Sequence, residues 1–172
     1  MWLPEQELGM AWFKKKPKEA KIKRRAAELQ VLAKKGVPTG EAVTALAAAL
    51  GNEIAALVMR NPSLTVTVDE IADVVCQSVR EEARYTVSPS SSDAPKEVLT
   101  EPEFEQLTMR IINTATPNAT ITDAMAATAK ALGVMIATAA RQGGFDEVLR
   151  WGQNAVIDSA REARDCLARK EK

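Results

Sequence analysis

The chain has 172 residues, which is long enough to bury a hydrophobic core and fits one domain or two small ones. Basic and acidic residues number 23 each, so the net charge of zero points to no class of partner. Aromatic residues make up only 4%, and residues that favour helices outnumber those that favour strands. The composition therefore predicts an all-α protein.

Residues 1–16 are predicted to form a tail that is first aromatic and then basic. They contain no long apolar stretch ahead of a small-residue cleavage site, so they do not resemble a secretory signal, and we expect a cytoplasmic protein. The two cysteines, Cys76 and Cys166, lie far apart rather than in a spaced pair, which fits a reducing compartment. Both are expected to be small buried residues.

Six helical segments are predicted after this tail. The first begins near Pro17, a residue that suits the first turn of a helix, and ends at Gly36. The second spans residues 41–60 and ends before Pro62, because proline prevents its continuation. Both segments thus have a clear start and a clear end.

The third segment opens at Thr67 and runs to Arg84. Glu70 follows Thr67 by three residues, which is the spacing of a capping box. Residues 64–68 alternate like a strand, but so short a stretch without a pairing partner is expected to be an extended connector. Residues 86–99 are rich in serine and proline and lack apolar periodicity, which predicts a linker.

Three more helices are predicted after the linker. Thr100 and Glu103 have the spacing of another capping box, and the helix that they start reaches Thr114. The fifth segment spans residues 122–141 and the sixth spans residues 145–170. The chain is thus divided into an N-terminal tail (1–16), a first helical half (17–85), a Ser/Pro-rich linker (86–99) and a second helical half (100–172).

The two helical halves show an internal similarity. When residues 41–60 are laid over residues 123–142 without gaps, eight of the twenty positions are identical, although five of the eight are alanines. Residues 78–81 also resemble residues 159–162 at nearly the same offset. We expect about six helices in two similar three-helix halves that form a helical bundle. The alternative is two unrelated alanine-rich helices.

Apolar stripes predict which helix faces pack together. The second and fifth segments are expected to form the central pair of the core, and the third and sixth to pack against that pair. The four stripes in chain order are Leu46, Leu50, Ile54, Leu57 and Val58; Ile71, Val74, Val75 and Val79; Met125, Leu132, Met135 and Ile136; and Val148, Trp151, Ala155 and Val156.

The longest apolar stretches, residues 42–59 and 124–140, are not expected to span a bilayer. Glu53 interrupts the first and Lys130 the second, and an ionised residue at mid-span is costly in a membrane. Glu53 itself is open to two interpretations, a buried carboxyl group with a raised pKa or a solvated residue on the outer face of its helix. The second is more common and is expected here.

The sequence contains no recognisable catalytic site. It has no histidine, which excludes Ser–His and Cys–His pairs and histidine-ligated metals, and its glycines do not form a phosphate-binding loop. Asp69 and Asp73 share one helical face and would suit acid–base work or a hard cation. However, acids are expected at the start of a helix because they stabilise its dipole. We therefore expect no enzyme activity, no cofactor and no metal site.

These exclusions, together with several apolar alanine-rich helices, predict a non-enzymatic helical module for protein–protein interaction. Such a protein would act as an adaptor, an assembly factor or a regulator. It would work by presenting grooves between helices and by associating with itself, so we expect a protein partner and a homo-oligomer.

A basic run near the N-terminus supports another class of partner. It carries eight basic residues against one acid between positions 14 and 25 and could neutralise several phosphates of a nucleic acid. With Trp2, Trp12 and Phe13 upstream it would also suit an anionic membrane surface, a less favoured alternative that a start at Met10 would weaken by removing Trp2. A solvated or protein-binding tail is the plainest interpretation. The candidate anion-binding residues are Lys14, Lys15, Lys16, Lys18, Lys21, Lys23, Arg24 and Arg25.

Overall fold

The computed structural model describes residues 16–86, 98–140 and 144–171, with the side chains of the first range described from Glu19 on. Within these ranges all regular secondary structure is helical, which confirms the all-α prediction. Most of the predicted tail (1–16) and of the predicted linker (86–99) lies outside the described residues. The described helices are α2 (Lys16–Lys34), α3 (Thr39–Arg60), α4 (Val68–Tyr85), α5 (Glu101–Ala115), α6 (Ile121–Ala139) and α7 (Phe145–Lys170).

The predicted capping boxes fix the starts of α4 and α5. The Glu70 carboxylate accepts a hydrogen bond from the Thr67 backbone N–H at 2.7 Å, and the Thr67 hydroxyl accepts one from the Glu70 N–H at 3.2 Å. The Glu103 carboxylate accepts in the same way from the Thr100 N–H at 2.8 Å. Because these bonds satisfy backbone donors that have no partner inside the helix, they define the first turns.

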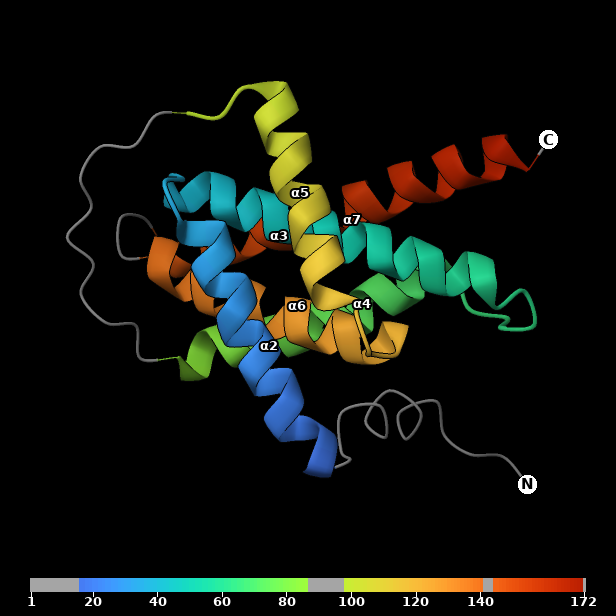
Figure 1. The fold of residues 1–172 in the computed structure, drawn as a ribbon, viewed down its shortest axis with the longest axis horizontal. Coiled ribbons are helices and arrows are strands. Elements are labelled where there is room, and N and C mark those ends of the chain that lie inside the picture. Colours follow the sequence, from blue (N-terminus) through green and yellow to red (C-terminus); the bar gives the residue numbers. More distant parts are fainter. Residues whose placement is uncertain (1–15, 87–97, 141–143, 172) are drawn as a thin grey trace.

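The two alanine-rich helices α3 and α6 pack on each other at the centre of the bundle (Figure 1). Their predicted stripes are buried, with Leu46, Leu50 and Ile54 of α3 and Leu132 and Ile136 of α6 at 0% exposure. The remaining four helices pack around this pair, with α7 and α5 on α3 and with α4 and α2 on α6. The predicted central pair is therefore confirmed.

The prediction that the outer stripes are buried is wrong for two residues. Val74 is 44% exposed and Trp151 is 43% exposed, because each lies one position before the stripe that its helix buries. One residue corresponds to about 100° of rotation around a helix, which moves a side chain from the packed face to its edge. On α7 the buried stripe contains Gly152. A Cβ atom added to this residue would lie 2.8 Å from the Ile136 Cδ1 atom. The close approach of α7 to Ile136 of α6 therefore places Gly152, and not Trp151, on the buried face.

Helices α3 and α6 have the length and mean hydropathy of helices that could cross a membrane, with mean hydropathies of 1.7 and 1.2. Of the apolar window in each, 67% and 61% respectively is buried inside the bundle. Such burial is ordinary for the central helices of a bundle, whose apolar residues face other helices. That neither helix spans a bilayer stays a prediction.

The helices of the two predicted halves interleave in space. The first helix of each half packs mainly on the middle helix of the other, α2 on α6 and α5 on α3. The third helices do the same, α4 on α6 and α7 on α3, while contacts within a half are sparse. The two halves therefore share one core, and neither could bury its central helix alone.

Aligned residues occupy matching places in this arrangement. Gly51 and Gly133, paired in the sequence alignment, each lie at a close approach of two helices: a Cβ on Gly51 would come within 2.6 Å of the Ala160 nitrogen, and one on Gly133 within 2.9 Å of the Val79 oxygen. The loops after α2 and α5 each contain a residue with positive φ, Gly36 at 73° and Asn118 at 55°. These correspondences support the internal repeat, which stays a prediction.

Candidate functional site

The basic run is only partly within the described residues. Lys14 and Lys15 lie outside them, as do Trp2, Trp12, Phe13 and the side chains of Lys16 and Lys18. Lys21, Lys23 and Arg24 are exposed on α2. Lys23 pairs with Glu19 at 3.3 Å and Arg24 with Glu28 at 3.4 Å, both one helical turn away. The nucleic-acid and membrane hypotheses for this run stay predictions.

Arg25, the last residue of the basic run, has a structural role. Its Nη1 atom donates to the backbone oxygens of Ala115 at 2.8 Å and Pro117 at 2.6 Å, at the end of α5. Carbonyls at a helix C-terminus lack partners inside the helix, and a cation there also interacts favourably with the helix dipole. Arg25 therefore ties α2 to the end of α5.

The acidic face of α4 also contributes to the fold. Asp69 makes a bidentate ion pair with Arg161 of α7: Oδ1 accepts a hydrogen bond from Nε and Oδ2 accepts one from Nη2, both at 2.9 Å. The hydrogen bond from Arg161 holds the pKa of Asp69 below its usual value. Among the described residues, no three Cys, Asp or Glu side chains cluster as ligands for a metal ion.

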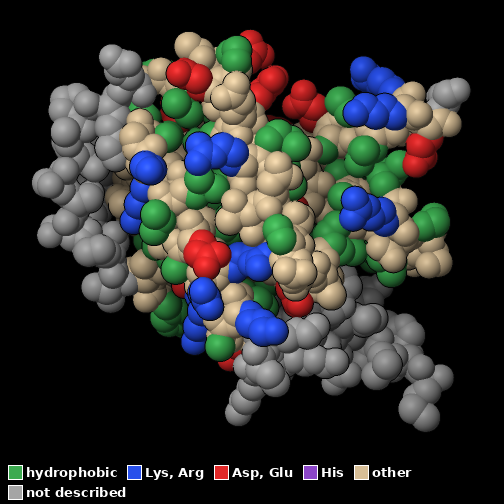
Figure 2. Space-filling model, viewed as in Figure 1, with side chains coloured by type: hydrophobic (Ala, Val, Ile, Leu, Met, Phe, Trp, Pro, Cys, Tyr) green, Lys and Arg blue, Asp and Glu red, His purple; other side chains and the backbone are tan. Residues whose placement is uncertain are grey.

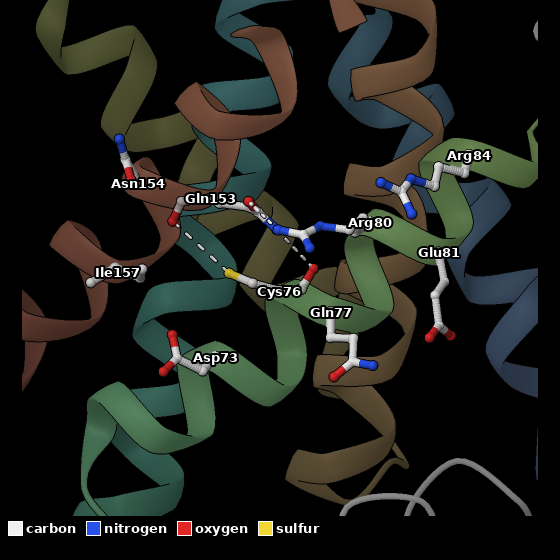
Figure 3. A pocket seen from close by; sticks show the side chains of 9 residues that line it. All are labelled: Asp73, Cys76, Gln77, Arg80, Glu81, Arg84, Gln153, Asn154 and Ile157. Atoms are coloured by element: carbon white, nitrogen blue, oxygen red, sulfur yellow. Dashed lines mark hydrogen bonds between the residues drawn. The ribbon is translucent and has the colours of Figure 1, made fainter. Parts of the chain in front are cut away.

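A polar cleft of about 400 Å³ lies between α4 and α7 (Figure 3). Gln153 of α7 projects towards α4 and links the two helices: its Nε2 donates to the Cys76 backbone oxygen at 3.2 Å, and its Oε1 accepts from Arg80 at 3.5 Å. Burial raises the pKa of the Cys76 thiol to about 12, so the thiolate that a nucleophile requires does not form near neutral pH. Gln153 therefore links α4 and α7 across this cleft.

A larger groove of about 790 Å³ is bounded by α3, α5 and the C-terminal part of α7. Small residues of α3 form its floor, and charged residues lie exposed at its rim. In Figure 2, apolar side chains are visible in the recess between α5 and the end of α7 at the upper right. The large apolar side chains lining the groove are Phe104, Met109, Ile112, Ile121 and Leu167.

Glu53 lines this groove, and the expectation that it is solvated is wrong. It is 3% exposed: Oε1 accepts from the Thr128 hydroxyl at 3.0 Å, and Oε2 is buried without a partner among the described residues. Burial raises its pKa to about 8, and the Thr128 hydrogen bond offsets this in part. The sequence indicates this burial, because Glu53 lies at helical spacing between Leu50 and Leu57 on the buried stripe.

Cys166, expected to be buried, is exposed and lines the same groove. All the buried residues of α7 come before position 161, so Cys166 lies on the part of the helix that extends beyond the core. Its neighbours Ala163 and Leu167 are half-buried on the same face. Its exposure follows from the length of α7, which the apolar pattern of the sequence does not reveal.

A counterpart of the groove lies between α2, α4 and α6, but it measures only about 150 Å³. The alignment of the halves pairs Ala48 and Ala163 of the groove with Lys130 and Glu82 of this cleft. The Lys130 ammonium and the Glu82 carboxylate form an ion pair at 2.8 Å there. Two long ion-paired side chains therefore line the cleft at the positions where the groove has two alanines.

The chain matches no known family model, no curated protein and no solved structure.

Proposed function

We propose that this chain is a non-enzymatic protein-binding module whose α3–α5–α7 groove receives an amphipathic helix. The single observation that carries the proposal is a groove of about 790 Å³ whose lining joins large apolar side chains to a floor of small residues. Grooves between helices bind helices through apolar anchors on successive turns. Small floor residues let a guest backbone approach closely.

The exposure of the lining supports this proposal. Met109 is 53% exposed on α5 and Phe104 is only partly buried, so both offer apolar surface at the groove. Methionine adapts its flexible side chain to different partner shapes, and aromatic anchors carry much of the energy of interfaces. A guest helix would cover these side chains.

The electrostatics of the floor also suit an apolar guest. With a pKa of about 8, Glu53 is mainly uncharged at neutral pH, so the groove floor carries no full charge there. The rim has charges of both signs, Glu105 and Glu162 against Arg60 and Lys170. An uncharged floor with a mixed rim is the usual layout of a protein interface, where charge is depleted at the centre.

Site-specific photo-crosslinking tests the proposal. A photoreactive side chain placed at Met109 faces the groove, and the same group at Ala27 provides a matched control, because Ala27 is exposed at the aligned position of α2. We expect protein adducts from position 109 in cell extract and none from position 27. Equal yields from the two positions, or no adduct at position 109, would contradict the proposal.

A further inference from the structure

The end of α7 combines exposure with an amphipathic pattern. It extends beyond the bundle in Figure 1, and no described residue after Ala160 in this helix is fully buried. A helical end that lacks tertiary packing is only marginally stable in water. The side of this end that lines the groove carries Glu162, Ala163, Cys166, Leu167 and Lys170.

This face is complementary to itself when two copies run antiparallel. With Cys166 at the centre, Glu162 of one copy lies opposite Lys170 of the other, and the same pair forms again on the other side of the axis. Ala163 and Leu167 lie between the charges and supply apolar contact. A two-fold interface requires this kind of self-matching surface.

The groove beside the α7 end offers a second apolar surface to a helix that packs against this end. Met109 and Ile112 of α5 form the opposite wall, and Ala48 and Ala56 of α3 form part of the floor. A second α7 end that packs against the first would therefore contact the apolar side chains of α5 on the side facing away from the first α7 end. Two copies would each fill the groove of the other.

Building on the proposed function, we infer that the helix in the groove is the α7 end of a second copy, paired antiparallel about Cys166. The resulting homodimer is two-fold symmetric, with Glu162–Lys170 ion pairs flanking an apolar centre. Each copy supplies both a groove and the helix that occupies one.

The oligomeric state and its response to charge reversal test this inference. Sedimentation equilibrium of the full chain is expected to give a dimer. Glu162→Lys and Lys170→Glu each place like charges opposite one another and should weaken dimerisation about tenfold. An equimolar mixture of the two variants, and the double variant Glu162→Lys/Lys170→Glu, should both recover the dimer. Recovery by neither would overturn the antiparallel pairing.

Thiol crosslinking provides an independent readout. A short bismaleimide should join Cys166 of one copy to Cys166 of the other, whereas the buried Cys76 should not react. The matched control is Val74→Cys in a Cys166→Ser background, because Val74 is exposed on α4 away from the groove lining. A dimer whose Cys166 residues do not crosslink, or one that crosslinks equally through position 74, would contradict the inference.

The two proposals can fail separately. If the chain is a monomer at all concentrations while the group at position 109 captures a different protein, the second copy is not the guest, and only the inference of a homodimer is wrong. If the chain is a monomer and position 109 captures nothing, both proposals are wrong. If the adduct from position 109 has the mass of a dimer and maps to α7, both are supported.

Discussion

The α3–α5–α7 groove and the α2–α4–α6 cleft are two versions of one arrangement, in which a middle helix carries the other half's first and third helices. They differ fivefold in volume, about 790 Å³ against about 150 Å³. Two aligned pairs of side chains contribute to the difference: Lys130 and Glu82 form an ion pair in the cleft, whereas Ala48 and Ala163 are small at the matching positions of the groove. Similar backbone packing can thus give a closed surface or an open site.

The middle helices differ in the same way at one buried position. Glu53 of α3 aligns with Met135 of α6, and both are buried. A methionine there needs no hydrogen-bond partner, whereas a carboxyl group loses its hydration and keeps one oxygen without a partner. The groove side therefore keeps a polar group that reduces stability, and the cleft side does not.

The largest effect is expected from making α3 resemble α6 with Glu53→Met. The folded-state pKa of about 8 lies above the ordinary value of 4.5, so the folded protein holds a proton that the unfolded chain has released. The stabilisation that this bound proton gives the folded state is therefore lost as the pH rises from 4.5 to 8. Over this range the free energy of unfolding falls by about 1.4 kcal/mol per pH unit. Glu53→Met should remove this slope and gain several kcal/mol at pH 9. Chemical denaturation across pH measures it.

Glu53→Gln is the matched control for that prediction, because it removes the titration but keeps a polar side chain. It should flatten the pH dependence as Glu53→Met does, with a smaller gain in the free energy of unfolding. If the wild type and both variants show the same dependence on pH, Glu53 is not the buried acid that the structure describes.

The next largest effect concerns the two matching helix crossings. Gly51→Ala places a Cβ within 2.6 Å of the α7 backbone, and Gly133→Ala places one within 2.9 Å of the α4 backbone. Backbone atoms cannot move aside as a flexible side chain can, so each variant should lose about 1–3 kcal/mol in urea denaturation. Gly40→Ala, where the nearest atom is 3.7 Å away, should lose nothing. Loss in only one of the two crossings would weaken the correspondence between the halves.

A smaller effect is expected from opening the cleft. Lys130→Ala with Glu82→Ala removes an ion pair whose side chains are 29% and 28% exposed. Partly solvated pairs contribute little, so the double variant should lose about 1 kcal/mol or less, and each single variant should lose at least as much because it leaves one charge unpaired. A double-mutant cycle measures the coupling. A coupling of several kcal/mol would show that the pair does more than fill the cleft.

Much of the fold could be predicted from the sequence because its signals are local. Capping boxes, prolines and glycines mark helix ends, and the apolar stripes of α3 and α6 identify the central pair. The apolar spacing placed Trp151 on the buried stripe of α7, whereas Gly152 is the residue at which α7 closely approaches Ile136. A local sequence pattern does not show which distant helix will pack closely against a small residue.

The groove was harder to predict because it depends on residues distant in sequence. Grooves between helices are predicted from the sequence, but no residue is assigned to the lining of one. Ala48, Met109 and Leu167 come from three helices, and none carries a motif. Glu53 is conspicuous in the sequence, but the usual frequency of exposed glutamates alone predicts that it faces solvent. Arg25 belongs to the basic run for which nucleic-acid binding is predicted, although it binds the end of α5, a contact between residues 90 positions apart.

The most direct test of the account is to give the groove the side chains of the cleft. Ala48→Lys with Ala163→Glu should form an ion pair like that of Lys130 with Glu82 and obstruct the groove between α3 and α7, with stability within about 1 kcal/mol of the wild type. The measurement is the yield of protein adducts from a photoreactive group at Met109. The account predicts that the adducts disappear while the fold is unchanged. Full crosslinking from a correctly folded variant would show that the groove is not where this protein binds.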